Sequence, residues 1–170
     1  VKFLGVRDSE DRGIAMIHQE LNLIDTLSVA ENIFLGREPK KHGLLDRAAM
    51  RSEATKALTS IEASIDPDLP VGMLSLAEKQ LLEIAKAVAR GARLVIMDEP
   101  SAVLAKKETE VLLSLVKRLR EKGTTVLYVS HRLDEVIEVC DQITVLRDGQ
   151  WVTTLANQRD GDKPTTMHEL

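Results

Sequence analysis

The sequence predicts an α/β fold in which helices cover a mostly parallel β-sheet and a helical insertion separates two of its strands. Short apolar runs at 13–17, 94–97 and 124–129 lack alternation, which is typical of strands buried on both faces of a parallel sheet. Helical segments between the later runs give right-handed βαβ units. The stretch 28–70 carries only helical patterns. We therefore predict a helical subdomain that covers this stretch and continues to about residue 90.

Composition narrows the classes of protein that fit. A chain of 170 residues with 44% hydrophobic and 29% charged residues is one soluble domain, or a large part of one. A net charge of -4 argues against a dedicated nucleic-acid binder, which would show a basic face. The single cysteine, Cys140, excludes an intrachain disulfide framework and fits a reducing cytoplasm. No apolar run approaches the ~18 residues of a membrane helix.

The first predicted elements lead to a polar strand exit. Residues 1–11 have a weak pattern, and we expect the end of a strand followed by a polar turn. The run 13–17 is a short buried strand, and the side chains of His18, Gln19 and Glu20 follow directly. This order of apolar strand and polar exit occurs again later in the chain.

The insertion begins at a predicted capping box, in which Ser28 caps a helix and Glu31 reaches back. That helix should end near Gly36, and the basic stretch 40–45 is expected to be a solvated loop. Apolar residues at helical spacing predict a second helix over 46–65. The helical subdomain is therefore expected to span about 28–90.

A second capping box opens the next helix, with Ser75 as the cap and Glu78 three residues later; Gly91 ends it. The strand 94–97 follows, and then a helix over about 106–121. The remaining predicted elements are a strand at 124–129, a helix at 133–140, a strand at 143–146 in the sheet, a hairpin turn at Asp148-Gly149, a strand at 151–155 and a linker or tail at 156–170.

Two adjacent carboxylates at the exit of the central strand suggest chemistry. Pro100 cannot donate to a sheet ladder, so the strand should stop at Asp98 and Glu99. Like charges side by side need a cation or a reacting water, because repulsion and desolvation oppose them. Parallel strands would bring these carboxylates, Gln19 and His131 to one edge of the sheet, where open α/β sheets bind ligands.

Here the chain resembles the nucleotide-binding subunits of ABC transporters, which have a P-loop NTPase-like fold. The resemblance runs from about Arg12 to Trp151, and the motifs are in the family's order and spacing. The segments HQEL and EIAKA resemble the first nucleotide-binding domain of ribose-, xylose- and galactose-type importers. Three stretches carry the likeness to the Q-loop, to the signature helix with the Walker B strand, and to the H-loop with its hairpin: MIHQELNLIDTLSVAENIFLGREP, LSLAEKQLLEIAKAVARGARLVIMDEPSAVL and VLYVSHRLDEVIEVCDQITVLRDGQ.

The resemblance implies roles for matching residues. Asp98 would hold Mg²⁺ through water, and Glu99 would orient the water that attacks the γ-phosphate of ATP. His131 would reach the γ-phosphate, and Gln19 would touch the metal and relay the nucleotide state to the transporter. Ser75, with Ala77 and Glu78 at the same helix start, would face ATP bound to a second nucleotide-binding domain.

Two departures from the family lie on the surface that would complete the partner's ATP site. Ala77 stands where the family usually has glycine, and a Cβ there limits close approach to phosphate. The stretch 102–105 is wholly apolar, although the family usually has a small polar residue there. We therefore hypothesise that this domain serves its partner's site poorly and that hydrolysis by the pair is asymmetric.

The sequence also lacks the phosphate-cradling motif G-x-x-x-x-G-K-[ST]. None of its nine glycines is followed by lysine. We expect Val1 to lie inside a parent domain, so that this piece, 1–155, binds ATP poorly and its sheet carries an unpaired edge or a gap.

The resemblance implies the ATPase of a sugar importer, on the cytoplasmic face of the membrane. Its partners would be transmembrane permease subunits, a second nucleotide-binding domain and, indirectly, a periplasmic sugar-binding protein.

Two alternatives remain open: an inactive docking or regulatory module, favoured by the missing motif, and a soluble ABC-type ATPase of DNA repair or translation. Only about fifty residues separate Gln19 from Ser75, too few for a repair enzyme's coiled coil. The acidic net charge disfavours a translation factor.

Overall fold

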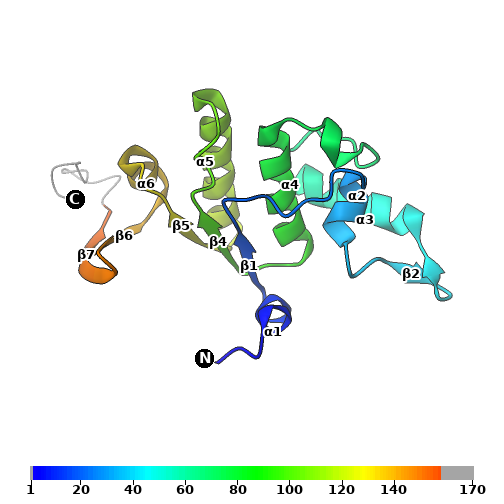
Figure 1. Cartoon of the computed structure of the whole chain (residues 1–170), viewed down its shortest axis with the longest axis horizontal. Coiled ribbons are helices and arrows are strands. Elements are labelled where there is room, and N and C mark those ends of the chain that lie inside the picture. Colours follow the sequence, from blue (N-terminus) through cyan, green and yellow to red (C-terminus); the bar gives the residue numbers. More distant parts are fainter. Residues whose placement is uncertain (1, 158–170) are drawn as a thin grey trace.

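A computed structural model describes residues 2–157 and has an α/β architecture with a parallel sheet (Figure 1). The sheet has three strands in the order β1 (Ile14–Ile17), β4 (Leu94–Asp98) and β5 (Thr125–Val129). β4 is central, and both of its pairings are parallel, with Ile17 opposite Met97 and Asp98 opposite Val129. The predicted fold class is confirmed, and the three strand exits meet at one edge.

Burial of the strands differs from the prediction of two covered faces. Side chains that point to one face, such as Ile17, Val95 and Met97, are almost fully buried in the core. On β5, Leu127 is 53% exposed and Val129 is 44% exposed. The strands therefore alternate between a core face and a partly open face. α4 packs on β1 and α5 packs on β5.

Four helical elements form the insertion, and they pack on one another (Figure 1). Both predicted capping boxes are confirmed, at Ser28 with Glu31 and at Ser75 with Glu78. Buried Asn32 holds the segment that leads into the first helix of the insertion. Its side chain accepts a hydrogen bond from the N–H of Ile24 and donates one to the carbonyl of Ile24. The elements are α2 (Val29–Phe34), α3 (Arg47–Ser60), η1 (Val71–Met73) and α4 (Leu76–Ala89).

Three local predictions were wrong. The start of the chain forms a helix, α1 (Val6–Asp11), instead of a strand end and turn; Asp8 accepts from the N–H of Leu4 and from Arg12 four residues on. The stretch 40–45 forms a short antiparallel hairpin instead of a loop. Its two exposed strands are β2 (Lys40–Lys41) and β3 (Leu44–Leu45), each of two residues. α3 ends at Ser60, not at 65, because Glu62 adopts a left-handed φ of 58°.

The C-terminal part of the described chain contains α5 (Lys106–Glu121), α6 (Leu133–Val139), β6 (Gln142–Arg147) and β7 (Gln150–Ala156). The hairpin turn at Asp148-Gly149 is confirmed, with φ values of 53° and 73°. β6 pairs only with β7 within residues 2–157, so the expectation that it continues the parallel sheet was wrong. The expectation was an unpaired edge or a gap, and within residues 2–157 the sheet ends at β1 on one side and at β5 on the other.

The predicted tail, 156–170, is described only at its start. Ala156 ends β7, and the side chain of Asn157 donates to the carbonyls of Ile137 and Cys140 at 2.7 Å each. The other residues of the tail lie outside the described part of the chain. Across residues 2–157, no helix combines the length and the apolar character needed to cross a lipid bilayer.

Candidate functional site

The loop after β4 holds Glu99 in a fixed and unusual backbone conformation. Glu99 has a φ of 45°, in the left-handed region that non-glycine residues rarely adopt. Its N–H donates to the carbonyl of Val129 at 2.9 Å, and its own carbonyl accepts from Ala102 at 3.1 Å. These bonds fasten the loop to the end of β5. Backbone strain of this kind tends to persist at functional sites, where the surroundings determine the geometry.

Glu99 and His131 lie next to each other at the carboxyl ends of β4 and β5. His131 Nδ1 is 3.1 Å from Glu99 Oε1. The carboxylate side chain is 32% exposed and the imidazole is 70% exposed, so both are open to a ligand. The pair offers a carboxylate that can orient a water, beside a ring nitrogen that can donate to an anion.

The buried carboxylate of Glu135 supports the two loops that carry Glu99 and His131. Glu135 on α6 is 2% exposed, and its Oε2 accepts from Ser101 Oγ at 2.5 Å and from Tyr128 Oη at 2.7 Å. Its Oε1 forms an ion pair with Arg132 at 2.7 Å. Burial and the bond to Glu135 raise the pKa of Tyr128. We call Glu135 and its partners Ser101, Tyr128 and Arg132 the buried Glu135 cluster. This cluster joins the loop after β4 to the loop that carries His131.

Sequence reasoning missed the buried Glu135 cluster. The available signal was helical phase: Glu135 lies four residues before Val139 and next to Val136, on the side of α6 that faces the core. A carboxylate at a core position needs hydrogen-bonding partners, since burying it unpaired is costly. That reasoning would have identified a buried polar group but not which donors satisfy it.

Gln19 is exposed just beyond β1, and the segment after it is fastened to α4. The N–H of Asn22 donates to Glu83 Oε1 at 3.1 Å, and Lys86 Nζ donates to the carbonyl of Asn22 at 3.0 Å. Nearer the start of α4, Lys79 pairs with Asp25 at 2.8 Å. The segment that follows Gln19 is therefore held against α4, the helix capped by Ser75.

Ser75, Ala77 and Glu78 cluster at the start of α4, apart from the other candidates. Glu78 Oε2 accepts from the N–H and from the hydroxyl of Ser75, at 2.8 Å each. Ala77 lines an apolar cavity of about 210 Å³ together with Leu104. No hydrogen bond or ion pair within residues 2–157 joins Ser75 to Asp98, Glu99 or His131. The described structure thus brings together Glu99 and His131, with Asp98 adjacent, but not the start of α4.

The donor set suits a magnesium–nucleotide complex better than a protein-enclosed ion. No group of three or more histidine, cysteine or acidic side chains that could hold a metal occurs in the described part of the chain. Mg²⁺ commonly takes one or two carboxylates and fills its remaining positions with water and substrate phosphates. Asp98 and Glu99 at the strand exit fit that requirement.

Comparison with known proteins defines the class. The family model described as ABC transporter matches residues 4–102, more than half of the chain, and the chain belongs to this family. Solved ATP-binding cassettes have the same fold. A nucleotide-free cassette gives a TM-score of 0.73 at 26% identity, covering 88% of this chain and 63% of that one. The ADP conformation of MJ1267 gives 0.72 at 28% identity, covering 86% and 62%.

Within the family, similar curated proteins are named as sugar import ATP-binding proteins. The ribose import ATP-binding protein RbsA of Chromobacterium violaceum is 54% identical over 85% of this chain and 29% of its own length. The arabinose import ATP-binding protein AraG of Pseudomonas fluorescens is 47% identical over 89% and 30%. The galactose/methyl galactoside protein MglA of Pasteurella multocida is 39% identical over 100% and 33%. The chain spans about a third of the length of these relatives.

Proposed function

We propose that this chain is part of an ATP-binding subunit that hydrolyses ATP to drive sugar import. The observation that carries the proposal is the pairing of Glu99 with His131 at 3.1 Å, at the exits of adjacent parallel strands. Its relatives named for ribose, arabinose and galactose import support a pentose or hexose as the transported substrate. In the proposed complex, ATP is bound together with Mg²⁺.

Each side chain has a defined task in this proposal. Asp98 would hold Mg²⁺ through water, and the metal would neutralise charge at the phosphates. Glu99 accepts a hydrogen bond from the attacking water and aims it at the γ-phosphate. His131 donates to the γ-phosphate, and its Nδ1 contact with Glu99 fixes its ring orientation. Gln19 contacts the metal and water, and Ser75, Ala77 and Glu78 face the ATP bound to a second domain.

Assembly and location belong to the same proposal. The complete protein would act on the inner face of the cell membrane with transmembrane permease subunits, and indirectly with a periplasmic sugar-binding protein. A second nucleotide-binding domain, in the same chain or in another, would complete each ATP site. Residues 1–155 would form most of one such domain, with a helical subdomain at about 28–90.

The decisive experiment replaces Glu99 in the complete protein that contains this chain. Glu99→Gln keeps the size of the side chain but cannot polarise the water as a carboxylate does. We expect ATP turnover to fall by a factor on the order of 10² or more, with ATP binding unchanged. Steady-state phosphate release and filter binding of labelled ATP measure the two properties.

Glu110→Gln, on the exposed side of α5, is the matched control and should leave turnover unchanged. Equal activity of Glu99→Gln and wild type would contradict the assigned role. If the wild-type complete protein releases no phosphate at all, the alternative of a docking or regulatory module takes its place.

A further inference from the structure

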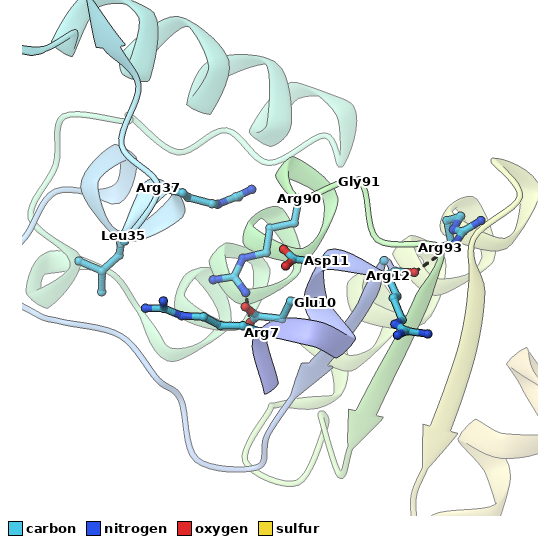
Figure 2. Close-up of a pocket in the computed structure, with 11 residues that line it drawn as sticks. Arg7, Glu10, Asp11, Arg12, Leu35, Arg37, Arg90, Gly91 and Arg93 are labelled. Carbon is cyan, nitrogen blue, oxygen red and sulfur yellow. Dashed lines mark hydrogen bonds and ion pairs between the residues drawn. The ribbon is translucent and has the colours of Figure 1, made fainter. Parts of the chain in front are cut away.

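A cavity of about 740 Å³ lies at the opposite end of the sheet from Asp98 and Glu99 (Figure 2). Gly13 and Arg93, which directly precede β1 and β4, form part of its wall. The wall contains five arginines but only two carboxylates. The whole chain has a net charge of -4, so this concentration of positive charge runs against the overall balance of the protein.

Three of these arginines come from separate elements and point into the same space (Figure 2). Arg7 extends from α1, Arg37 from the loop after α2, and Arg90 from the end of α4. We call these three residues the arginine cluster. Because they are far apart in sequence, only the tertiary fold brings them together, and no local sequence pattern would have revealed the cluster.

The arginine cluster has fewer internal counterions than charges. Glu10 forms an ion pair with Arg90. Neither Arg7 nor Arg37 has a carboxylate within ion-pair distance in the described residues, and the Nε of Arg90 is buried there without a hydrogen-bond partner. Like charges held this close repel, and an added anion would relieve that repulsion.

The surroundings of Arg37 also indicate a positive charge without a matching counterion. Its guanidinium lies 5.4 Å from the centre of the Phe34 ring and donates to the carbonyl of Ile33 at 3.3 Å, so the side chain is held toward the cavity. Burial, followed by the charge of Arg90, lowers the pKa of Arg37, and Glu10 opposes this shift. Arginine remains protonated at neutral pH, so the uncompensated charge persists.

We propose that the arginine cluster binds a small phosphorylated ligand at a site separate from the ATP site. Guanidinium groups match phosphate oxygens in a bidentate geometry, and three of them around one space can hold a pyrophosphate or two phosphoryl groups. The cavity volume lies in the range of ligand sites, about 300–1,000 Å³. The phosphoryl group can belong to a soluble metabolite or to a phospholipid headgroup.

The test titrates inorganic pyrophosphate into the 170-residue chain by isothermal calorimetry. We expect saturable binding at one site, about tenfold weaker or more in the double variant Arg7→Gln, Arg37→Gln. Arg147→Gln removes an arginine that is 84% exposed on the β6–β7 hairpin and should bind like wild type. Arg90 stays unchanged because its ion pair with Glu10 joins α4 to α1.

Flotation with phosphatidylglycerol vesicles, against phosphatidylcholine vesicles, separates the two sources of phosphate. Binding of pyrophosphate supports a soluble ligand, and binding of anionic vesicles alone supports a headgroup, provided that the double variant loses it. The proposal is overturned if neither probe binds. It is also overturned if the double variant binds as tightly as wild type, or if Arg147→Gln weakens binding as much as the double variant does. Circular dichroism checks folding; if the double variant unfolds, the exposed Arg7→Gln replaces it.

Discussion

Glu99 is held by its own backbone before any ligand arrives. Its φ of 45° costs on the order of 1 kcal/mol in a residue with a Cβ. The bonds to Val129 and Ala102 fix the peptide groups on either side. The backbone of Glu99 is therefore fixed, and its carboxylate lies 3.1 Å from His131 Nδ1.

At the scale of residues, the sequence predicted that Glu99 and His131 lie together, but not which buried side chains support them. Asp98, Glu99 and His131 could be placed because parallel strands end at one edge, a rule that needs only the strand positions. The contact between Glu135 and Ser101 joins residues 34 positions apart, and nothing local in the chain specifies it. Side-chain networks of this kind depend on tertiary packing.

Tyr128 provides a direct test of the buried Glu135 cluster, because it is the only tyrosine in the chain. Its raised pKa means that the folded protein keeps the phenol proton when the unfolded chain has lost it, above about pH 10. We expect no phenolate absorbance in the native chain near pH 10.5, and stability that declines as the pH rises further.

The same ultraviolet titration in denaturant is the control and should give an ordinary tyrosine curve. Glu135→Gln should bring the native curve toward that of the unfolded chain, since it removes the negative charge beside the phenol. A native curve that overlays the denatured one would mean that Tyr128 is open to solvent.

At the scale of elements, helix starts were predicted better than helix ends. Ser28 and Ser75 could be recognised as caps because the capping box is a four-residue pattern. The early end of α3 depends on Glu62 adopting a left-handed conformation, which favours glycine and has no sequence signal here. α1 was missed because none of its residues is buried, so hydrophobic periodicity is absent.

The capping box of α2 predicts a pH-dependent contribution to stability. Hydrogen bonds from Ser28 lower the pKa of Glu31, so its charged form stabilises the fold above the unfolded pKa. That contribution is lost as the pH falls through the lower, folded value. Glu31→Gln should therefore cost about 0.5 kcal/mol at pH 7 and less near pH 3. Urea unfolding at both pH values measures the difference.

Glu110→Gln serves as the matched control for this measurement, because Glu110 lies in the middle of α5 and does not cap a helix. An equal loss for Glu31→Gln at both pH values would show that the carboxylate charge is not what stabilises the start of α2.

On the scale of the whole molecule, the sheet order could be predicted in part. β1, β4 and β5 pair as expected from consecutive crossover connections. β6 was expected beside them, but it forms a separate hairpin with β7. Sequence periodicity identifies a strand but not the strands that pair with it, and within residues 2–157 β5 is the last strand of the parallel sheet.

The hypothesis of an asymmetric pair is tested in the complete protein through Ala77. Ala77→Gly removes the Cβ at the start of α4 that would limit close approach to a partner's phosphate. We expect turnover of the pair to rise several-fold, as measured by phosphate release. Ala48→Gly, at the exposed second residue of α3, is the control for added backbone freedom, because Ala77 is likewise the second residue of its helix. Unchanged turnover in Ala77→Gly would count heavily against the hypothesis.

α4 connects the candidate residues at Ser75 with the arginine cluster. Its 14 residues extend about 21 Å, from the cap at Ser75 to Arg90 in the arginine cluster. If both proposed ligands bind one molecule, their two binding equilibria belong to one thermodynamic cycle. Whatever factor a phosphorylated ligand imposes on nucleotide affinity, the nucleotide must impose on that ligand in return.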